Sequence, residues 1–208
     1  MLYAARDAGI ALVAYLCNVV NQDNPDKQTA LLAKILSAAH GPRVLELGTG
    51  CGIVGLEMHY LCPNSEVILT DLPEAMEVLD HNAQLVRSRT DEGHLETMVL
   101  DWEEPLLEPL KKDPKDVILV SDCTYNSDSI PALVKTLAAL IEISPSALAV
   151  VSMKVRHDSE AIFFDLMSNA GLVSLEHSTI PMPDRFRSES GQRLEVVDVY
   201  VYAKKHDN

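Results

Sequence analysis

The 208-residue chain has few aromatic and few basic residues. Aromatic residues make up 5%, with a single tryptophan, and 17 Lys and Arg stand against 31 Asp and Glu, which gives a formal net charge of −14. Because phosphate binding needs a basic face, this balance argues against nucleic acid as the main substrate. It is compatible with a basic, lysine-bearing partner, and equally with an acidic surface that only keeps the protein soluble.

Cysteine and histidine patterns that hold metals or disulfides are missing. The four cysteines show no C-x-x-C spacing and the seven histidines no H-E-x-x-H pattern. We therefore expect no metal site, no disulfide framework and a reducing compartment. The longest apolar run, Ala8 to Val20, is too short to span a bilayer, and no small-x-small cleavage site follows it. We expect a monomer with no membrane attachment, located in the cytoplasm, with the nucleus as the alternative.

The nine glycines are unevenly distributed, and several gather in one loop. Residues 44–52 read V-L-E-L-G-T-G-C-G, an apolar strand that runs into alternating glycines and so brings bare backbone against a ligand. Counted from Gly50, the spacing fits the dinucleotide fingerprint G-x-G-x-x-G, but the strand runs straight into Gly48. Counted from Gly48, Ile53 breaks that fingerprint, and Glu46 suits a ligand with an ammonium group. S-adenosylmethionine (SAM) has an ammonium group and no phosphate; a plain tight turn is the alternative.

A second apolar strand, residues 66–71, also ends in an acid. Asp71 lies 21 residues after Gly50, about where nucleotide-binding folds place the acid that binds a ribose. Its carboxylate can accept hydrogen bonds from both ribose hydroxyls. The alternative is a helix N-cap, because the sequence from Asp71 to Glu74 also resembles a helix start.

Two further strands end in acids next to aromatic residues. After residues 95–100 come Asp101 and Trp102, which could accept a hydrogen bond from an adenine amine and provide apolar surface; a half-buried core tryptophan is the alternative. After residues 117–121 comes D-C-T-Y, with Asp122 and Tyr125. Asp122 could hold the loop or receive an amine, or could simply form an Asx turn.

These motifs together resemble a known enzyme family. The glycine loop resembles motif I, E-x-G-x-G-x-G, of the class I, seven-strand SAM-dependent methyltransferases, and D-x-x-Y resembles the signature of methyltransferase family 16, the relatives of the valosin-containing-protein and elongation-factor lysine methyltransferases. Residues 6–12, 79–82 and 156–164 resemble further family segments. The resemblance implies an N-methyltransferase that uses SAM, releases S-adenosylhomocysteine and modifies a lysine of a protein. A small-molecule N-methyltransferase and a non-catalytic SAM-fold binding module are the alternatives.

The resemblance also implies the site. Tyr125 and Asp122 are expected at the methyl acceptor. The residues expected at the cofactor are Glu46, Gly48, Thr49, Gly50, Asp71, Leu72, Asp101, Trp102 and Ser121. Residues 181–187 could contact substrate or be a mobile connection. Arg6 stands where the family has a tryptophan that covers the cofactor pocket, and the sequence begins almost at this helix, so we expect a shortened sequence or a pocket without this lid.

Alternating helix and strand patterns predict the fold. We expect a single α/β domain over residues 1–208, with N-terminal helices in 1–40 and a Rossmann-like core in 41–208. The expected helices cover residues 4–20, 25–39, 53–61, 73–88, 130–143 and 159–170, and the expected strands 43–47, 66–71, 95–100, 117–121, 148–153, 172–177 and 194–202, with a surface loop at 103–116. Strands separated by helices pair in parallel, and the last two strands have no helix between them. The prediction is a mostly parallel sheet in the order 3-2-1-4-5-7-6, with the last strand antiparallel and helices on both faces.

Overall fold

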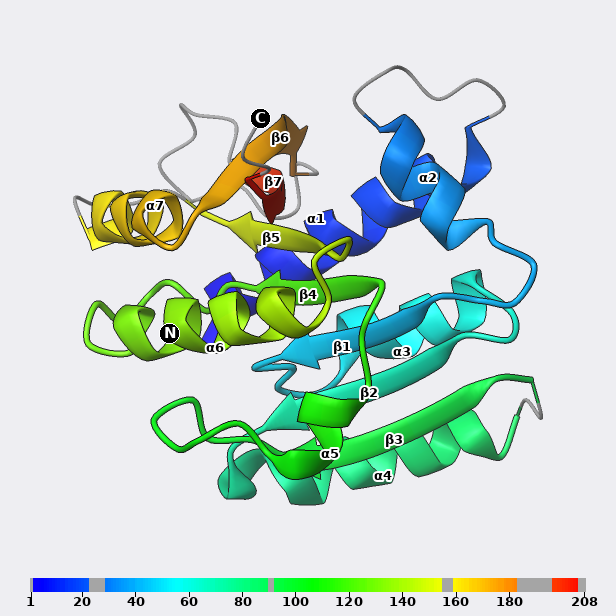
Figure 1. Ribbon diagram of the computed structural model, residues 1–208. Coiled ribbons are helices and arrows are strands. Elements are labelled where there is room, and N and C mark those ends of the chain that lie inside the picture. The colour runs from blue at the N-terminus through cyan, green and yellow to red at the C-terminus, as the bar shows by residue number, and fades with distance from the viewer. Residues whose placement is uncertain (1, 23–28, 90–91, 155–158, 183–195, 206–208) are drawn as a thin grey trace.

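The protein has one seven-stranded sheet with helices packed on both faces (Figure 1). The computed structural model describes residues 2–22, 29–89, 92–154, 159–182 and 196–205. The strands are β1 (Arg43–Leu47), β2 (Glu66–Asp71), β3 (His94–Val99), β4 (Val117–Ser121), β5 (Leu148–Met153), β6 (Leu172–Pro181) and β7 (Val196–Lys204). Their order, β3-β2-β1-β4-β5-β7-β6, and the antiparallel direction of β7 confirm the prediction.

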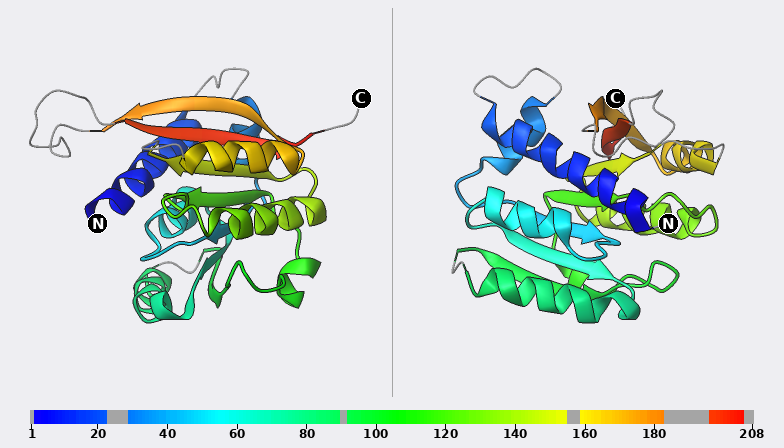
Figure 2. Two further views of the ribbon diagram at one scale, coloured as in Figure 1. Left: turned by 90° about the vertical axis from the view of Figure 1, so that its left-hand side faces the viewer. Right: turned by 180° about the vertical axis from the view of Figure 1, so that it is seen from behind.

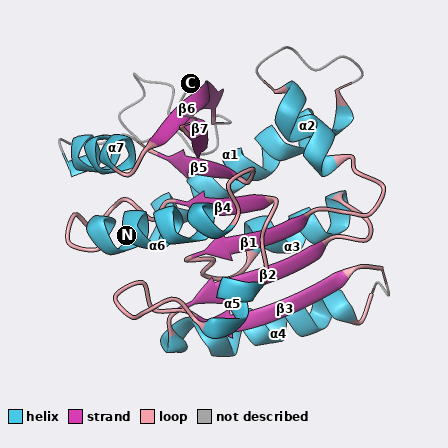
Figure 3. Ribbon diagram, in the orientation of Figure 1, coloured by secondary structure: helices cyan, strands magenta, loops and turns pink. Residues whose placement is uncertain are grey.

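Two groups of helices cover the two faces of the sheet, as the views in Figure 2 and the colouring of Figure 3 show. The helices are α1 (Leu2–Asn21), α2 (Ala30–Leu36), α3 (Ile53–Leu61), the 3₁₀ turn η1 (Pro73–Ala75), α4 (Met76–Arg87), α5 (Glu108–Lys112), α6 (Ile130–Ile143) and α7 (Ser159–Asn169). Helices α1 to α4 pack on one face and α5 to α7 on the other, each over its own hydrophobic cluster. Among the described residues, none of these helices is long and apolar enough to cross a membrane.

The central strands are apolar along their whole length because both of their faces are covered. All six residues of β5 are buried, as are four of the five in β4. Parallel strands sandwiched between helices are typically continuous apolar runs. The strands at the edges differ: most residues of β3 and β6 are exposed or half-buried, with only Leu95 buried in β3 and only Leu172 and Glu176 in β6. The core therefore lies on both sides of β1, β4 and β5.

The helix and strand limits differ from the predictions at several points. The second helix begins at Ala30 and ends at Leu36 rather than at Ala39. Directly after its last residue, the Ser37 hydroxyl donates a hydrogen bond to the carbonyl of Ala33. Residues 25–28 of the predicted helix lie outside the described residues. The predicted loop 103–116 contains α5, which has proline in its first turn, a favourable position for a helix start. Strands β6 and β7 run four and two residues further than predicted because they pair with each other over most of their length.

Parallel pairing puts the ends of four strands at one edge of the sheet. Leu47 at the end of β1 pairs with Thr70 of β2 and Val120 of β4, while Ser121 pairs with Ser152 of β5. The loops that follow β1, β2, β3 and β4 therefore meet at this carboxyl edge, where ligands bind in open α/β sheets.

Candidate cofactor and methyl-acceptor site

The loop after β1 depends on three glycines with left-handed backbone conformations. The φ angles of Gly48, Gly50 and Gly52 are +63°, +59° and +88°, a region that other residues enter only at a cost. Gly52 directly precedes α3, so the loop turns tightly from strand into helix. The sequence G-T-G-C-G thus forms the predicted tight loop between a strand and a helix.

The first and second glycines face different surroundings. A Cβ on Gly48 would lie 2.7 Å from Cys123 Sγ and 3.0 Å from Trp102 Cζ2, so this part of the loop is tightly covered. A Cβ on Gly50 would meet nothing within 4 Å, and Gly50 is exposed. The loop therefore presents open backbone at Gly50, while Gly48 is packed against the protein.

Glu46 lies beneath the loop and holds it from inside. Its side chain is 1% exposed, and Oε2 accepts a 2.5 Å hydrogen bond from the Thr49 hydroxyl and a 2.8 Å bond from the Gly55 N–H. Burial raises the pKa of the Glu46 carboxyl to about 7; the two hydrogen bonds oppose this rise and the charge of Asp71 adds to it. The role predicted for Glu46 with the cofactor stays a prediction, and the structure adds that this carboxyl fixes the loop.

Asp71 links the end of β2 to the glycine loop. Oδ2 accepts a 2.6 Å hydrogen bond from the Gly50 N–H, and Oδ1 a 2.7 Å bond from the Leu72 N–H. The following 3₁₀ turn has Leu72 as its N-cap and no side-chain cap, so Asp71 does not cap it as the alternative suggested. A carboxylate oxygen can accept a second hydrogen bond, and Asp71 is only partly buried, so ribose hydroxyls can still reach it.

Asn82 of α4 also holds the loop, a role that the sequence did not reveal. Its Nδ2 donates a 2.9 Å hydrogen bond to the Cys51 carbonyl. Residues 79–82 resemble a family segment in the sequence, but the partner of Asn82 lies 31 residues away. The glycine loop is thus restrained by Glu46 from beneath and by Asn82 from α4.

Asp101 and Trp102 lie in the turn after β3. Asp101 Oδ1 accepts a 2.9 Å hydrogen bond from the Glu103 N–H, which shapes the turn. The Trp102 ring is partly buried, packs against the core on the α6 side and covers Gly48, while its Nε1 is buried without a partner among the described residues. The packing of Trp102 is therefore that of a half-buried core tryptophan, as the alternative suggested. The same ring also contacts the glycine loop, so Trp102 lies at the predicted site.

Cys123 is a second group that covers Gly48, and sequence reasoning did not assign it a role. Its Sγ lies 3.3 Å from the Ser121 carbonyl oxygen and 3.5 Å from that of Leu47. Burial, with the charges of Glu46 and Asp71, raises the pKa of the Cys123 thiol far above its usual range. The thiol is therefore a neutral packing group, and its position directly after the motif acid was the signal available in the sequence.

The D-x-x-Y segment continues along the same edge. Asp122 is buried with φ at +52°, a left-handed conformation, and its N–H donates a 2.9 Å hydrogen bond to the Ser152 carbonyl. Tyr125 is 70% exposed. Ser121 Oγ lies 3.1 Å from Ser152 Oγ. The structure thus brings every predicted site residue to one edge of the sheet, where Tyr125 is exposed and Asp122 is buried.

Three predicted features lie partly or wholly outside the described residues. The backbone of Arg6 belongs to α1, but its side chain is not described. Residues 155–158 of the basic turn and 183–187 of the loop between the final strands lie outside the described residues.

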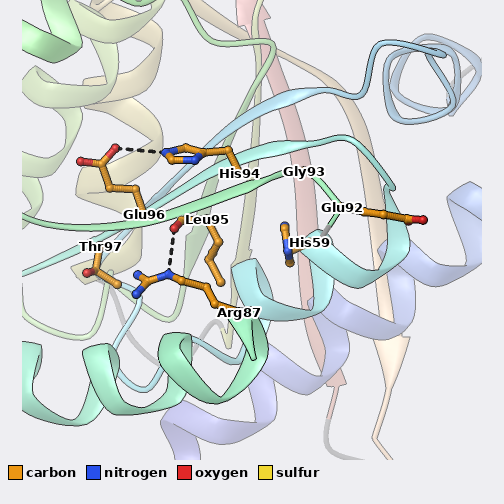
Figure 4. Close-up of a pocket in the computed structure, with 8 residues that line it drawn as sticks. All are labelled: His59, Arg87, Glu92, Gly93, His94, Leu95, Glu96 and Thr97. Atoms are coloured by element: carbon orange, nitrogen blue, oxygen red, sulfur yellow. Dashed lines mark hydrogen bonds and ion pairs between the residues drawn. The ribbon is translucent and has the colours of Figure 1, made fainter. Parts of the chain in front are cut away.

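A hollow on the described surface lies away from these loops (Figure 4). It has a volume of about 560 Å³ and lies at the amino end of β3, where the Arg87 Nε donates to the Leu95 carbonyl and His94 forms an ion pair with Glu96. This is the edge of the sheet opposite to the glycine loop. In the part of the chain that the structure describes, no three His, Cys, Asp or Glu side chains come together as a metal site.

The residues at the carboxyl edge fit SAM. Gly50 offers open backbone, the Asp71 carboxylate lies beside it, and two exposed apolar side chains, Leu72 and Val99, stand next to Asp71 and offer surface for an adenine. A glycine loop with open backbone, an acid beside it and an apolar flank are thus present together. Sheet order and site define the class I SAM-dependent methyltransferase fold.

Comparison with known proteins places the chain within this class. Residues 5–170 match the family model described as lysine methyltransferase, so the chain belongs to that family. It is 28% identical over 165 residues to the protein-lysine N-methyltransferase EFM6 of Saccharomyces cerevisiae (72% of this chain, 64% of that protein) and 27% identical over 166 residues to the EEF1A lysine methyltransferase 3 of Mus musculus (80% and 62%). The chain spans less than two thirds of the length of these relatives.

Solved structures show the same fold. The chain resembles a SAM-dependent methyltransferase from Methanosarcina mazei with a TM-score of 0.58 at 13% identity, covering 82% of this chain and 95% of that one. At this identity the similarity supports the fold alone.

Proposed function

We propose that this protein is a SAM-dependent N-methyltransferase that methylates the side chain of a lysine in a protein substrate and releases S-adenosylhomocysteine. The observation that carries the proposal is the junction at the carboxyl edge, where the glycine loop and Asp71 lie beside the D-x-x-Y segment. Membership of the lysine methyltransferase family supports the choice of substrate.

The cofactor supplies an activated methyl group on a sulfonium. The residues proposed to bind it are Gly48, Thr49, Gly50 and Ser121 through the loop and strand ends, Asp71 at the ribose, Leu72, Asp101 and Trp102 at the adenine, and Glu46 beneath the loop. Such a transfer depends chiefly on placing a neutral nucleophile behind the methyl. The protein's task is therefore to position the acceptor.

Tyr125 and Asp122 are the residues proposed for this task. Exposed Tyr125 can pack on the aliphatic part of a lysine, and buried Asp122 can receive its amine. A lysine that leaves water next to a sulfonium has its pKa lowered by desolvation and by the like charge, which favours the neutral amine that reacts.

Two other functions remain as outcomes of the test. The same sheet can serve a small-molecule amine or pyridine as acceptor, and the replacement of the family tryptophan by Arg6 motivates a binding module without catalysis. We expect the protein to act as a monomer in the cytoplasm, without nucleic acid or membrane as partner.

Transfer of tritium from methyl-labelled SAM into a cell lysate tests the proposal. The expected result is a discrete labelled protein band. Acid hydrolysis of the protein in this band should yield labelled methyl-lysine. Label confined to small solutes supports a small-molecule acceptor. Folded protein that binds S-adenosylhomocysteine but transfers no label to any lysate component contradicts catalysis.

A further inference from the structure

Two residues in the first half of α1, Asp7 and Ala8, contact residues at the end of β5. Asp7 forms an ion pair with Lys154, the residue after β5, and the two side chains are only 8% and 12% exposed. One residue further along the helix, the Ala8 carbonyl oxygen accepts a 3.1 Å hydrogen bond from Ser152 Oγ. These four residues, which we call the α1 junction, join positions about 145 residues apart in the sequence.

Ser152 connects the α1 junction to the methyl-acceptor side of the site. Its carbonyl oxygen accepts the hydrogen bond from the Asp122 N–H, and its Oγ lies 3.1 Å from Ser121 Oγ. Asp122 has a left-handed backbone, a conformation that persists in a non-glycine residue only when its surroundings hold it there. The same serine thus contacts α1 with its side chain and Asp122 with its backbone.

Contact between α1 and the cofactor side is of a different kind. A Cβ on Gly9 would lie 2.9 Å from Cγ2 of Ile53 and 3.6 Å from Cγ2 of Val54, so the helix packs closely there against apolar side chains of α3. The glycine loop has its own restraints, from Asp71, Glu46 and Asn82. Loosening α1 should therefore affect the acceptor side more than the cofactor side.

We propose that the ion pair of Asp7 and Lys154 is a positioning device for the methyl acceptor, which holds α1 on Ser152 and thereby keeps Asp122 in its left-handed conformation. The catalytic meaning of this inference rests on the proposed function. Its structural content, that the ion pair restrains the segment after β4, can be measured without any substrate.

The test removes both charges at once. The double variant Asp7→Leu/Lys154→Met keeps side-chain volume and avoids leaving one buried charge unpaired, which would itself destabilise the fold. The control, Glu142→Leu/Lys204→Met, makes the same kind of substitution at a more exposed ion pair, at the opposite edge of the sheet. Equal thermal midpoints of the variant and wild type show that the fold is kept.

Hydrogen exchange is the first measurement. We expect amides of residues 121–126 to exchange about tenfold or more faster in the junction variant, since the Asp122 N–H depends on Ser152, while residues 48–55 and the control variant keep wild-type rates. Unchanged exchange at 121–126 in the folded variant overturns the inference.

Methyl transfer is the second measurement, on the labelled lysate protein. We expect kcat to fall about tenfold or more with the dissociation constant for S-adenosylhomocysteine within a few-fold of wild type, because small displacements of a reactant are costly. Full turnover in the folded variant overturns the positioning role. Absence of transfer by the wild-type protein contradicts the proposed function instead, and leaves the exchange result to decide this inference. Should the double variant not fold, Ser152→Ala, which removes one hydroxyl, is measured in the same two ways.

Discussion

The carboxylate of Asp71 accepts a 2.6 Å hydrogen bond from the backbone N–H of Gly50, across 21 residues of sequence. This bond joins the ends of the first two strands, and it is made by the acid that is predicted to bind the ribose. One side chain therefore serves both the shape of the loop and, by our proposal, the cofactor.

Asp71→Ala should weaken cofactor binding at least tenfold and also lower stability. A hydrogen bond to a charged group contributes about 1.5–3 kcal/mol, and the variant loses those to ribose as well as those to Gly50 and Leu72. Calorimetric titration with S-adenosylhomocysteine and urea denaturation measure the two effects. Asp80→Ala is the control, because Asp80 accepts a hydrogen bond from Thr97 and does not contact the loop. Unchanged affinity in a folded Asp71→Ala protein would contradict the ribose role.

Substitution of two glycines by alanine should have contrasting effects. Gly50→Ala places its methyl in open space, so we expect only the cost of a left-handed backbone, about 1–2 kcal/mol, but a marked loss of cofactor affinity. Gly48→Ala pays the same cost and also collides with Cys123 and Trp102, so its stability should fall further. Adding Cys123→Ala to Gly48→Ala should recover part of the loss. Equal stability of the two single variants would show that Gly48 is not tightly covered.

The pKa of Glu46, raised to about 7, predicts a loss of stability as pH rises. Below the ordinary pKa of 4.5 both states are protonated; between 4.5 and about 7 only the unfolded chain loses its proton, so this contribution is present at low pH and disappears through pH 7. The free energy of unfolding of wild type minus that of Glu46→Gln should therefore fall by on the order of 2 kcal/mol from pH 5 to 8. Urea titrations at several pH values give this difference. A difference that does not change with pH contradicts the prediction.

His59 should act in the opposite direction. Burial, with the nearby His94, lowers the pKa of His59 below its ordinary 6.5, and its buried Nδ1 has no partner among the described residues. The neutral ring favours the folded state above pH 6.5, and that contribution is lost as pH falls through the folded-state pKa, because only the unfolded chain readily takes up the proton. Relative to His59→Leu, wild type should lose stability on acidification. The same loss in both proteins would exclude His59 as the cause.

Much of the fold could be predicted because its signals are local. Apolar strands separated by amphipathic helices determine parallel pairing, and the acids and glycines that end the strands mark the binding edge. The long pairing of β6 with β7 was less visible, since edge strands mix polar and apolar residues. Helix α5 was missed because it is short, and its proline and charged residues are also typical of a loop.

The contacts that restrain the site were beyond the sequence for another reason. Asn82 reaches Cys51, Cys123 covers Gly48, and Asp7 pairs with Lys154, all between residues far apart in the chain. No periodicity or spacing encodes such pairs, which exist only once the sheet is assembled. The sequence could therefore identify residues that gather at the carboxyl edge of the sheet, but not the residues that restrain them there.

Tyr125→Ala tests the acceptor side of the site directly. Because Tyr125 is 70% exposed, its removal should leave the free energy of unfolding nearly unchanged. The affinity for S-adenosylhomocysteine should stay within a few-fold of wild type. Turnover should fall about 100-fold if the ring positions the lysine, since a displacement of about 1 Å can cost that much. Trp102→Ala should instead weaken cofactor binding and stability, because its ring covers Gly48. Tritium transfer and calorimetry on both variants distinguish the two sides, and a Tyr125→Ala protein with full turnover would reduce the D-x-x-Y segment to a structural turn.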